Sequence, residues 1–334
     1  MATDTHDAPG GARAETTTES TTDQRDGEDE DAGPYTRWVQ RSIREPGRVY
    51  RAMFVVVTIF FLVTTLFPLY WLGVLALTEQ GKMTDVGLVP NGFNPAVFVE
   101  VFETVPFHWY MFNSIVIGLV TTAIVLVFAS LAGYVFGRME FPGRTPLMLV
   151  VLAISYFPPV AFLLPLFRLF TGNVALTFPG TDVAITSPML FNTPGALVLP
   201  YSALFMPLSI FILTTFYAQI PDGLERASRV EGTTRLGALY RVIVPLSAPG
   251  LATAGVLTFI SVYNEFFFGF LMTDGQPDHW APIVWGIFRF QGQYADLYNY
   301  MAAASLIGIV PVAVLVVVAQ ERIVSGLTAG ALKE

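Results

Sequence analysis

Six long apolar segments constrain this 334-residue chain more than any other feature. A helix needs about 20 mostly apolar residues to cross the hydrocarbon core of a bilayer. Segments of this kind lie at about residues 52–77, 109–136, 147–170, 195–218, 248–272 and 301–320. Only 13% of the residues are charged, against about 25% in soluble domains. The sequence therefore predicts an all-α integral membrane protein with six transmembrane helices, several of them kinked by proline.

The first 34 residues have a different composition from the rest of the chain. Residues 1–33 contain ten Asp or Glu and two Arg, so they account for the whole formal net charge of −8. This stretch has almost no aliphatic residues to bury, which predicts a disordered acidic tail. It also lacks the basic start and the apolar core of a signal peptide. We expect two regions, a tail over residues 1–34 and a transmembrane domain over residues 35–334.

The distribution of basic residues predicts the orientation in the membrane. Outside the tail, 13 Lys or Arg flank the spans on the side of the N-terminus, and three lie on the opposite side. Cytoplasmic flanks of transmembrane helices carry the excess of Lys and Arg. We therefore expect a multi-pass protein of the cell membrane with both termini in the cytoplasm.

Several kinds of chemistry are not expected from these residues. The chain has no cysteine, and its histidines, His6, His108 and His279, lie far apart without the spacing of metal ligands. A phosphate-binding loop needs glycines and a Lys followed by Ser or Thr. The two lysines, Lys82 and Lys333, do not fit that pattern. We expect no catalytic residues, no metal and no cofactor of its own, and any ATP hydrolysis must belong to another polypeptide.

A charged segment, residues 219–247, interrupts the apolar chain on the predicted cytoplasmic side. Asp222 is typical of the N-cap of a short helix, and Gly232 of the left-handed position after its C-terminus. Thr233 or Thr234 is suited to cap a second helix, which Pro245 would end. The pattern predicts an elbow of two short helices hinged at glycine.

The elbow also contains residues spaced for ion pairs and a face of small side chains. Glu225 with Arg229 and Glu231 with Arg235 have the spacing of ion pairs. A plain solvated loop would carry the same pairs, so they do not by themselves indicate a docking surface. One face is open to close approach by another protein because it carries small residues, which are Ala227, Ser228 and Gly232.

The spacing of this segment resembles the signature loop of ABC-importer permeases. The matching positions are Ile220, Pro221, Leu224, Ala227, Gly232, Val242 or Ile243, Pro245 and Leu246. The resemblance implies that the first short helix is a coupling helix, seated in a cleft of an ATP-binding subunit. One position departs from the family: its Glu-Ala-Ala triplet falls on Arg226, Ala227 and Ser228, while Glu225 lies one residue earlier and Glu231 precedes the glycine.

The C-terminus, AQERIVSGLTAGALKE, resembles the ending of carbohydrate-importer permeases of the maltose type. In that family the tail runs between the paired ATPase subunits. The resemblance therefore implies an ATPase contact through five residues: Gly326, Leu327, Thr328, Gly330 and Lys333. Further matches are LAGYVFGR with FPGR, LFNTPGALVLPYSA and YNEFFFGF, so the resemblance covers nearly everything after residue 50. Residues 174–188 look like an insertion.

What the family resemblance implies is a six-helix permease domain of the type I ABC-importer fold. The partners would be a second homologous permease, two ATP-binding subunits that hold ATP and Mg²⁺, an extracellular solute-binding protein, membrane lipid and a sugar, with no nucleic acid. An importer of glycerol phosphate would need outward arginines, and the sequence offers Arg168 and Arg289, so a neutral sugar is favoured.

Three polar residues within the predicted spans are candidates for the translocation path. Ionisable groups at membrane depth usually face the interior of a bundle or a wet cavity. Asn264 and Glu265 therefore line the path, contact the partner permease or hydrogen-bond a kinked neighbour, and Asn113 either caps the second span or lies near the path. A secondary transporter is the alternative class, but it would need paired inverted halves and more buried charge. A membrane enzyme would need a nucleophile–base or metal constellation, which the sequence lacks.

Overall fold

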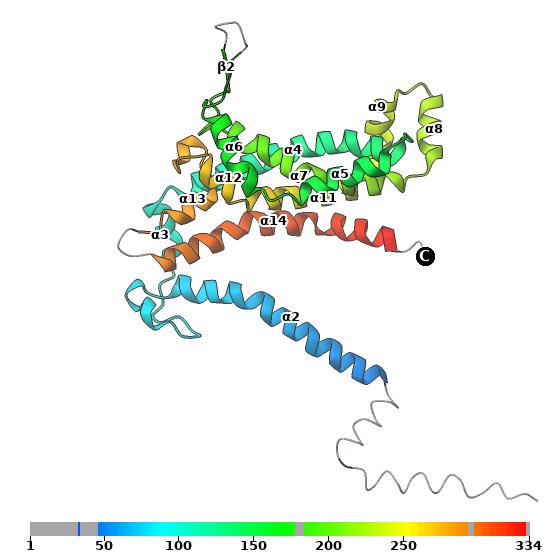
Figure 1. The fold of residues 1–334 in the computed structure, drawn as a ribbon. Helices are drawn as coiled ribbons and strands as arrows, with labels where there is room; N and C mark the ends of the chain where they lie inside the picture. The colour runs from blue at the N-terminus through cyan, green and yellow to red at the C-terminus, as the bar shows by residue number, and fades with distance from the viewer. Residues whose placement is uncertain (1–32, 34–45, 178–183, 293–296, 332–334) are drawn as a thin grey trace, which may run out of the picture. The chain divides into compact units, whose positions relative to one another are not determined.

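The computed structural model describes residues 33, 46–177, 184–292 and 297–331. The chain forms two units, residues 1–68 and 69–334, and the division falls at Pro68 within α2. The predicted acidic tail lies, apart from Gly33, outside the described residues. In chain order the elements are α2 (Pro46–Leu77), η1 (Gln80–Asp85), α3 (Val97–Thr104), α4 (Phe107–Arg138), α5 (Arg144–Ser155), α6 (Val160–Phe170), β1 (Ala175–Thr177), β2 (Ala184–Thr186), α7 (Gly195–Ala218), α8 (Asp222–Val230), α9 (Arg235–Ala238), η2 (Leu239–Ile243), α10 (Val244–Leu246), α11 (Ala248–Tyr263), α12 (Phe267–Leu271), η3 (Pro277–His279), α13 (Ile283–Phe288) and α14 (Tyr298–Ala331) (Figure 1).

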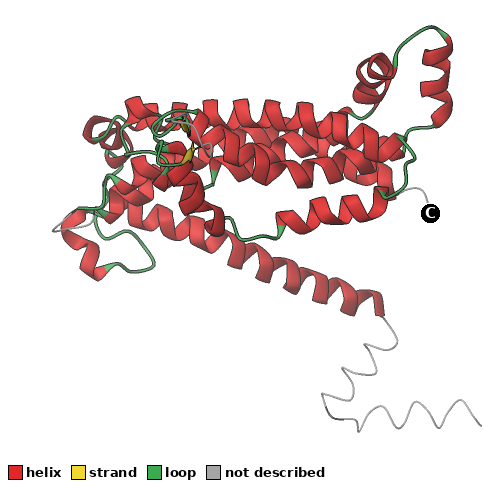
Figure 2. Ribbon diagram, turned by 45° about the horizontal axis from the view of Figure 1, so that its top comes forward, coloured by secondary structure: helices red, strands yellow, loops and turns green. Residues whose placement is uncertain are grey.

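Helices dominate the described residues, in agreement with the predicted all-α membrane class (Figure 2). Four stretches are long and apolar enough to cross a membrane as single helices: Tyr50–Leu77, Phe107–Arg138, Gly195–Ala218 and Tyr298–Gln320. Two further helix pairs reach the required length and apolarity together, but each is bent by 82°. They are Arg144–Ser155 with Val160–Phe170, and Arg235–Leu246 with Ala248–Tyr263. The described residues thus contain four to six candidate spans, and six is the number that the sequence predicts.

Two of the predicted spans are broken rather than continuous. The third, residues 147–170, divides into α5 and α6 at Tyr156–Pro159, where two consecutive prolines disfavour continued helix in the residue before each. The fifth, residues 248–272, ends as a helix at Tyr263 and resumes as α12 at Phe267. The prolines at positions 200 and 207 of α7 and at 311 of α14, in contrast, lie within continuous helices.

The second unit is a bundle in which α4, α7, α11 and α14 lie side by side (Figure 1). Its buried apolar residues form three clusters. One joins α3, α4, α11, α13 and α14, another joins α4, α7, α11 and η2, and a third joins α4, α6, α7, α11 and α12. The elbow of α8 and α9 projects from one end of this unit, and the β1–β2 hairpin lies at the other (Figure 1).

The hairpin is the exception to the predicted all-α fold. Its strands pair antiparallel, with Leu176 opposite Ile185. It occupies the stretch that the sequence identifies as an insertion, and its tip, residues 178–183, lies outside the described residues. In the first unit, the residues of α2 from Tyr50 to Pro68 are exposed on every side of the helix, as for an apolar helix with lipid or other membrane helices around it.

Small residues and hydroxyl groups hold the central helices together. The Ser209 and Thr258 hydroxyls lie 2.9 Å apart between α7 and α11, and the Tyr263 hydroxyl donates to the Gly308 carbonyl at 3.0 Å between α11 and α14. Gly137 on α4 allows a close approach to α7, because a Cβ there would lie 3.0 Å from the Thr214 carbonyl oxygen. Such small-residue contacts are typical of helix pairs in membranes.

The Gly137 contact predicts the effect of adding a side chain. Gly137→Val would push α4 away from the backbone of α7, so we expect a loss of about 1–3 kcal/mol and a lower apparent melting temperature in detergent. Gly73→Val is the matched control, because a Cβ on Gly73 meets nothing within 4 Å. Equal melting temperatures for the two variants would contradict the close α4–α7 contact.

Candidate functional site

The elbow beyond α7 forms as two short helical segments, and its predicted caps at Gly232 and Thr234 are confirmed. The second segment does not end at Pro245, as the sequence predicts, but runs through it to Leu246. Gly232 follows the end of α8 with φ of +90°, the left-handed conformation that glycine adopts without strain. The Thr234 hydroxyl accepts the Gly237 amide at 3.0 Å and so caps α9. The prediction for Asp222 is wrong by one position: Pro221 is the N-cap, and Asp222 is the first residue of α8.

One arginine at the end of α4 holds the start of this elbow. All three guanidinium nitrogens of Arg138 contact the elbow and the linker before it. Nε donates to Glu225 Oε2 at 2.9 Å and Nη1 donates to the Ile220 carbonyl at 2.6 Å, while Nη2 forms an ion pair with Asp222 Oδ1 at 2.9 Å. The Tyr134 hydroxyl donates to the second oxygen of Glu225 at 2.5 Å. Both oxygens of the Glu225 carboxylate are therefore committed to α4.

The predicted ion pairs along the elbow do not form. Among the ion pairs of the described residues, neither Glu225 with Arg229 nor Glu231 with Arg235 appears. Glu225 turns inward instead, with its side chain 14% exposed. A buried arginine without a counter-ion would be far more costly than two unpaired surface charges, which explains the choice.

Arg226, the residue that departs from the Glu-Ala-Ala triplet, points away from the bundle. Its side chain is 76% exposed, and it lies 3.5 Å from the Asp222 carboxylate in a solvated pair. Glu225 therefore does not replace a carboxylate on the outer face of α8, because it faces α4. The outer face carries a positive charge at this position.

Of the remaining elbow residues predicted from the sequence, one is buried and hydrogen-bonded within the elbow, and the others are exposed. Ser228 is buried, and its hydroxyl donates to the Glu225 carbonyl at 2.8 Å. The Ser228 carbonyl accepts the Thr233 amide and hydroxyl, which closes the turn after α8. Three others, Ala227, Glu231 and Pro245, are exposed. The elbow thus presents one face to the bundle and leaves another open.

The predicted C-terminal contact residues lie at the end of the chain. The helix α14 continues to Ala331, so Gly326, Leu327, Thr328 and Gly330 belong to it by backbone conformation. Lys333 lies outside the described residues. Their expected contact with an ATPase stays a prediction.

The polar residues assigned to a translocation path serve different structural roles. Asn113 lies within α4, six residues after its start, so it does not cap the helix. Its amide nitrogen donates to the Pro277 and Ala281 carbonyls at 2.7 and 3.0 Å and holds the loop that precedes α13. Asn264 is exposed and donates to Ile260 one turn back.

Glu265 repairs the break between α11 and α12. Its carboxylate accepts the backbone amides of Phe267, Phe268 and Gly269 at 2.9, 3.0 and 3.4 Å. It also accepts the Tyr201 hydroxyl of α7 at 2.7 Å. Of the three expected roles, hydrogen bonding to a kinked neighbour is the one for which the geometry supplies contacts.

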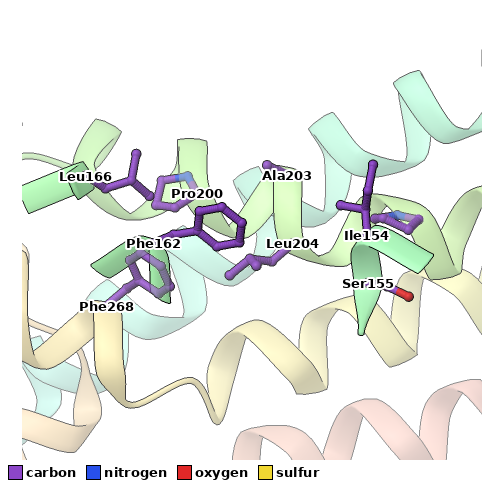
Figure 3. Close-up of a pocket in the computed structure, with 9 residues that line it drawn as sticks. Ile154, Ser155, Phe162, Leu166, Pro200, Ala203, Leu204 and Phe268 are labelled. Carbon is purple, nitrogen blue, oxygen red and sulfur yellow. The ribbon is translucent and has the colours of Figure 1, made fainter. Parts of the chain in front are cut away.

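An apolar hollow of about 190 Å³ lies where the break between α5 and α6 meets α7 (Figure 3). Its lining residues are Ile154, Ser155, Phe162, Leu166, Pro200, Ala203, Leu204, Pro207 and Phe268. The Ser155 hydroxyl already donates to the Leu152 carbonyl at 2.6 Å. A sugar has many hydroxyl groups, so this apolar hollow by itself offers little to bind one.

A polar cluster at the opposite end from the elbow was not found from the sequence, because its members are up to 87 residues apart. The Asp274 carboxylate accepts the Asn192 amide at 3.0 Å, the His279 ring at 2.8 Å and the Gln276 backbone amide at 3.0 Å. Burial opposes the charged form of Asp274, but these hydrogen bonds outweigh it and lower its pKa below the ordinary 3.8.

Arg289 is also committed within this end of the molecule. Its guanidinium donates to the Tyr110 hydroxyl at 3.2 Å and to the Gly275 carbonyl at 2.9 Å. In the part of the chain that is described, no group of three or more His, Asp or Glu side chains is placed to hold a metal ion.

Comparison with known proteins gives these features a family context. Residues 126–325 match the family described as "Binding-protein-dependent transport system inner membrane component". The chain is 36% identical to the sulfoquinovosyl glycerol transport system permease protein of Agrobacterium fabrum, over 81% of this chain and 90% of that one. It is 34% identical to the trehalose transport system permease protein of Mycobacterium tuberculosis, over 80% and 92%. It is 33% identical to the trehalose/maltose transport system permease protein of Thermococcus litoralis, over 85% of this chain and 97% of that one.

Solved structures show the same architecture. A chain of a bacterial ABC transporter involved in the import of the acidic polysaccharide alginate superposes with a TM-score of 0.63 at 17% identity, over 82% of this chain and 96% of that one. A chain of a bacterial alginate ABC transporter in complex with an alginate pentasaccharide-bound periplasmic protein superposes with a TM-score of 0.58 at 19% identity, over 84% of this chain and 94% of that one. At such low identity the likeness concerns the fold.

The role of Glu265 as a cap predicts the effect of its substitution. Glu265→Ala leaves the amides at the start of α12 without their acceptor, so we expect a loss of about 1.5–3 kcal/mol in stability. Glu265→Gln keeps an acceptor oxygen and should lose less. Apparent melting temperatures in detergent measure both. Equal values for Glu265→Ala and the native protein would show that the carboxylate does not stabilise the break.

The lowered pKa of Asp274 predicts a pH dependence with a definite sign. A carboxyl whose pKa is lower in the folded than in the unfolded state contributes fully above the unfolded value, 3.8, and loses that contribution as the pH falls through the folded value. The melting temperature of the native protein should therefore exceed that of Asp274→Ala between about pH 5 and pH 7, and this excess should shrink as the pH falls below about 4. A difference that disappears between about pH 7 and pH 5 would contradict this assignment.

Proposed function

The chain belongs to the family of binding-protein-dependent transport system inner membrane components, and from that membership we propose that it is the permease subunit of an ATP-binding-cassette importer for a neutral carbohydrate. Its fold is the type I importer permease fold that the sequence predicts. The observation that carries the proposal is the long match to permease proteins named for sugar transport systems, which spans 90–97% of the three relatives described above.

The proposed assembly contains a second homologous permease, two ATP-binding subunits and an extracellular solute-binding protein. ATP and Mg²⁺ belong to the ATP-binding subunits, because neither Lys82 nor Lys333 lies in a phosphate-binding loop. We propose that α8 binds in a cleft of one ATP-binding subunit through its outer face, where Arg226 is exposed. Both termini are then cytoplasmic, in line with the 13 basic residues on that side.

Transport follows from two conformations of the permease pair, one open inward and one open outward. Closure of the two ATP-binding subunits around ATP draws the elbows of the two permeases together. A ligand shifts such an equilibrium only by its differential affinity for the two conformations, so ATP must favour the outward-open one. The solute-binding protein then delivers the sugar to that conformation.

The charge distribution supports a neutral substrate over glycerol phosphate. A phosphate group is bound most strongly by arginine, whose guanidinium presents several donors. Arg289, one of the two outward arginines, already donates to Tyr110 and Gly275. Asn264 and Glu265 remain proposed neighbours of the translocation path, since the break in the fifth span must face protein or water rather than lipid.

Removing the coupling loop tests the proposed function. Deletion of residues 225–232, or Gly232→Pro, should abolish both sugar uptake and co-purification of the ATP-binding subunit, because Gly232 has φ of +90° and proline requires about −65°. Gly87→Pro, in the loop after η1, is the control and should keep both. Uptake of radiolabelled trehalose and maltose in whole cells, with pull-down from membranes, measures the outcome.

The result that overturns the proposal is equally definite. Normal uptake together with normal assembly after the deletion would remove the coupling role of α8. Uptake that needs no nucleotide and follows an ion gradient would instead identify a secondary transporter.

A further inference from the structure

The helix α4 is tied by polar side chains at both of its ends. It has 32 residues, so it is about 48 Å long at 1.5 Å per residue. At one end, the Tyr110 hydroxyl donates to the Gly275 carbonyl at 2.9 Å, and the Ser114 hydroxyl accepts the Ile283 amide at 2.7 Å. At the other end, Tyr134 and Arg138 bind the start of α8. One rigid element therefore connects the loop before α13 with the elbow.

At its N-terminal end, the coupling helix α8 is attached to the bundle in two ways that differ in kind. The first is covalent: α7 ends at Ala218 and reaches α8 through Gln219, Ile220 and Pro221. A short linker of this type fixes where α8 begins but leaves rotation about its backbone bonds. The second attachment is the guanidinium of Arg138, which binds the linker carbonyl of Ile220 and two carboxylates in the first turn of α8.

The geometry of the second attachment restrains this rotation. A planar guanidinium presents its N–H groups in fixed directions, so three separate acceptors define its orientation. Glu225 is bound through both oxygens, one to Arg138 and one to Tyr134. The side chain of Arg138 is 4% exposed, so water cannot substitute for a lost partner.

Near this joint α4 and α7 are also packed tightly against each other. Gly133 and Gly137 bring the two backbones together: a Cβ on Gly133 would lie 3.0 Å from Leu213 Cβ, and one on Gly137 would lie 3.0 Å from the Thr214 carbonyl oxygen. The Ser130 and Tyr217 hydroxyls, 2.7 Å apart and buried, bridge the same two helices. A displacement of the α4–α7 pair near this joint would therefore also displace α8.

We propose that Arg138 is the positioning residue of the coupling helix, and that α4 carries movement between the loop at residues 275–283 and the elbow. The inference rests on the proposed function. It assigns Glu225 to the permease itself, where it anchors α8 to α4, and leaves Arg226 to face the ATP-binding partner. Loss of the Arg138 joint leaves α8 bound to its partner but free to swivel, so ATP hydrolysis continues while less sugar is moved.

A purely stabilising role for Arg138 makes a different prediction. In that case its loss would lower the amount of assembled complex, while each assembled complex would hydrolyse the same number of ATP molecules per transported sugar as the native complex. The quantity that separates the two is the number of ATP molecules hydrolysed per sugar transported, measured on the purified complex in proteoliposomes with its solute-binding protein and radiolabelled trehalose or maltose.

For Arg138→Gln we expect this ratio to rise about fivefold or more, in the range of usual coupling energies. Arg138→Lys keeps the charge but not the fixed directions and should give a smaller rise. Arg144→Gln, which removes an equal charge at the start of α5, is the matched control and should leave the ratio unchanged. An unchanged ratio in assembled Arg138→Gln overturns the proposal. If neither Arg138 variant assembles, the joint is structural and the proposal is likewise overturned.

A second measurement needs no sugar. Because the native chain has no cysteine, spin labels can be placed at Phe128→Cys on α4 and Val230→Cys on α8, both exposed. The distance distribution by double electron–electron resonance should be narrow in this background and broad after Arg138→Gln. A distribution that stays narrow overturns the joint. If the native complex transports neither sugar, the proposed substrate class fails, and the distance measurement still decides the role of Arg138.

Discussion

A peptide N–H or C=O inside a bilayer finds no water, so each one must be bonded within the protein. This constraint decides where the chain is allowed to leave the helical conformation. At the break between α11 and α12, one carboxylate, that of Glu265, accepts three backbone amides and a tyrosine hydroxyl. An acidic residue at membrane depth is thereby explained by the backbone groups that it satisfies. Helix breaks of this kind, once satisfied, give a membrane bundle the bends around which helices can move.

Hydrogen bonds from polar side chains of one helix, α4, also hold the segments at the two ends of the bundle. Asn113 and Tyr110 bond to carbonyls of a loop more than 160 residues away in sequence, and Arg138 bonds to the elbow. All three lie on α4, which also packs closely against α7. A permease must relate events at one surface of the membrane to events at the other, and a long helix bonded to both surface segments does so without a separate device.

The structure also changes the meaning of the departure in the signature loop. In the sequence, Glu225 stands next to the position where the family has its glutamate, and Arg226 occupies that position. Helical geometry separates two adjacent side chains by about 100° around the axis, so they cannot share one face. Glu225 is committed to Arg138 and Tyr134, and Arg226 is solvated. The outer face of α8 thus carries an arginine at this position.

The sequence by itself determined the membrane class, the six apolar segments, the elbow and two of its caps, because hydropathy and capping act over a few neighbouring residues. Gly232 and Thr234 were found in this way. The tertiary structure alone decided that Glu225 pairs with Arg138 rather than Arg229, that Asn113 holds a distant loop, and that the third and fifth segments break. Those outcomes depend on which helices lie side by side. A buried charge or amide takes whichever partner the packing brings within reach, and that partner is not fixed by spacing along the chain.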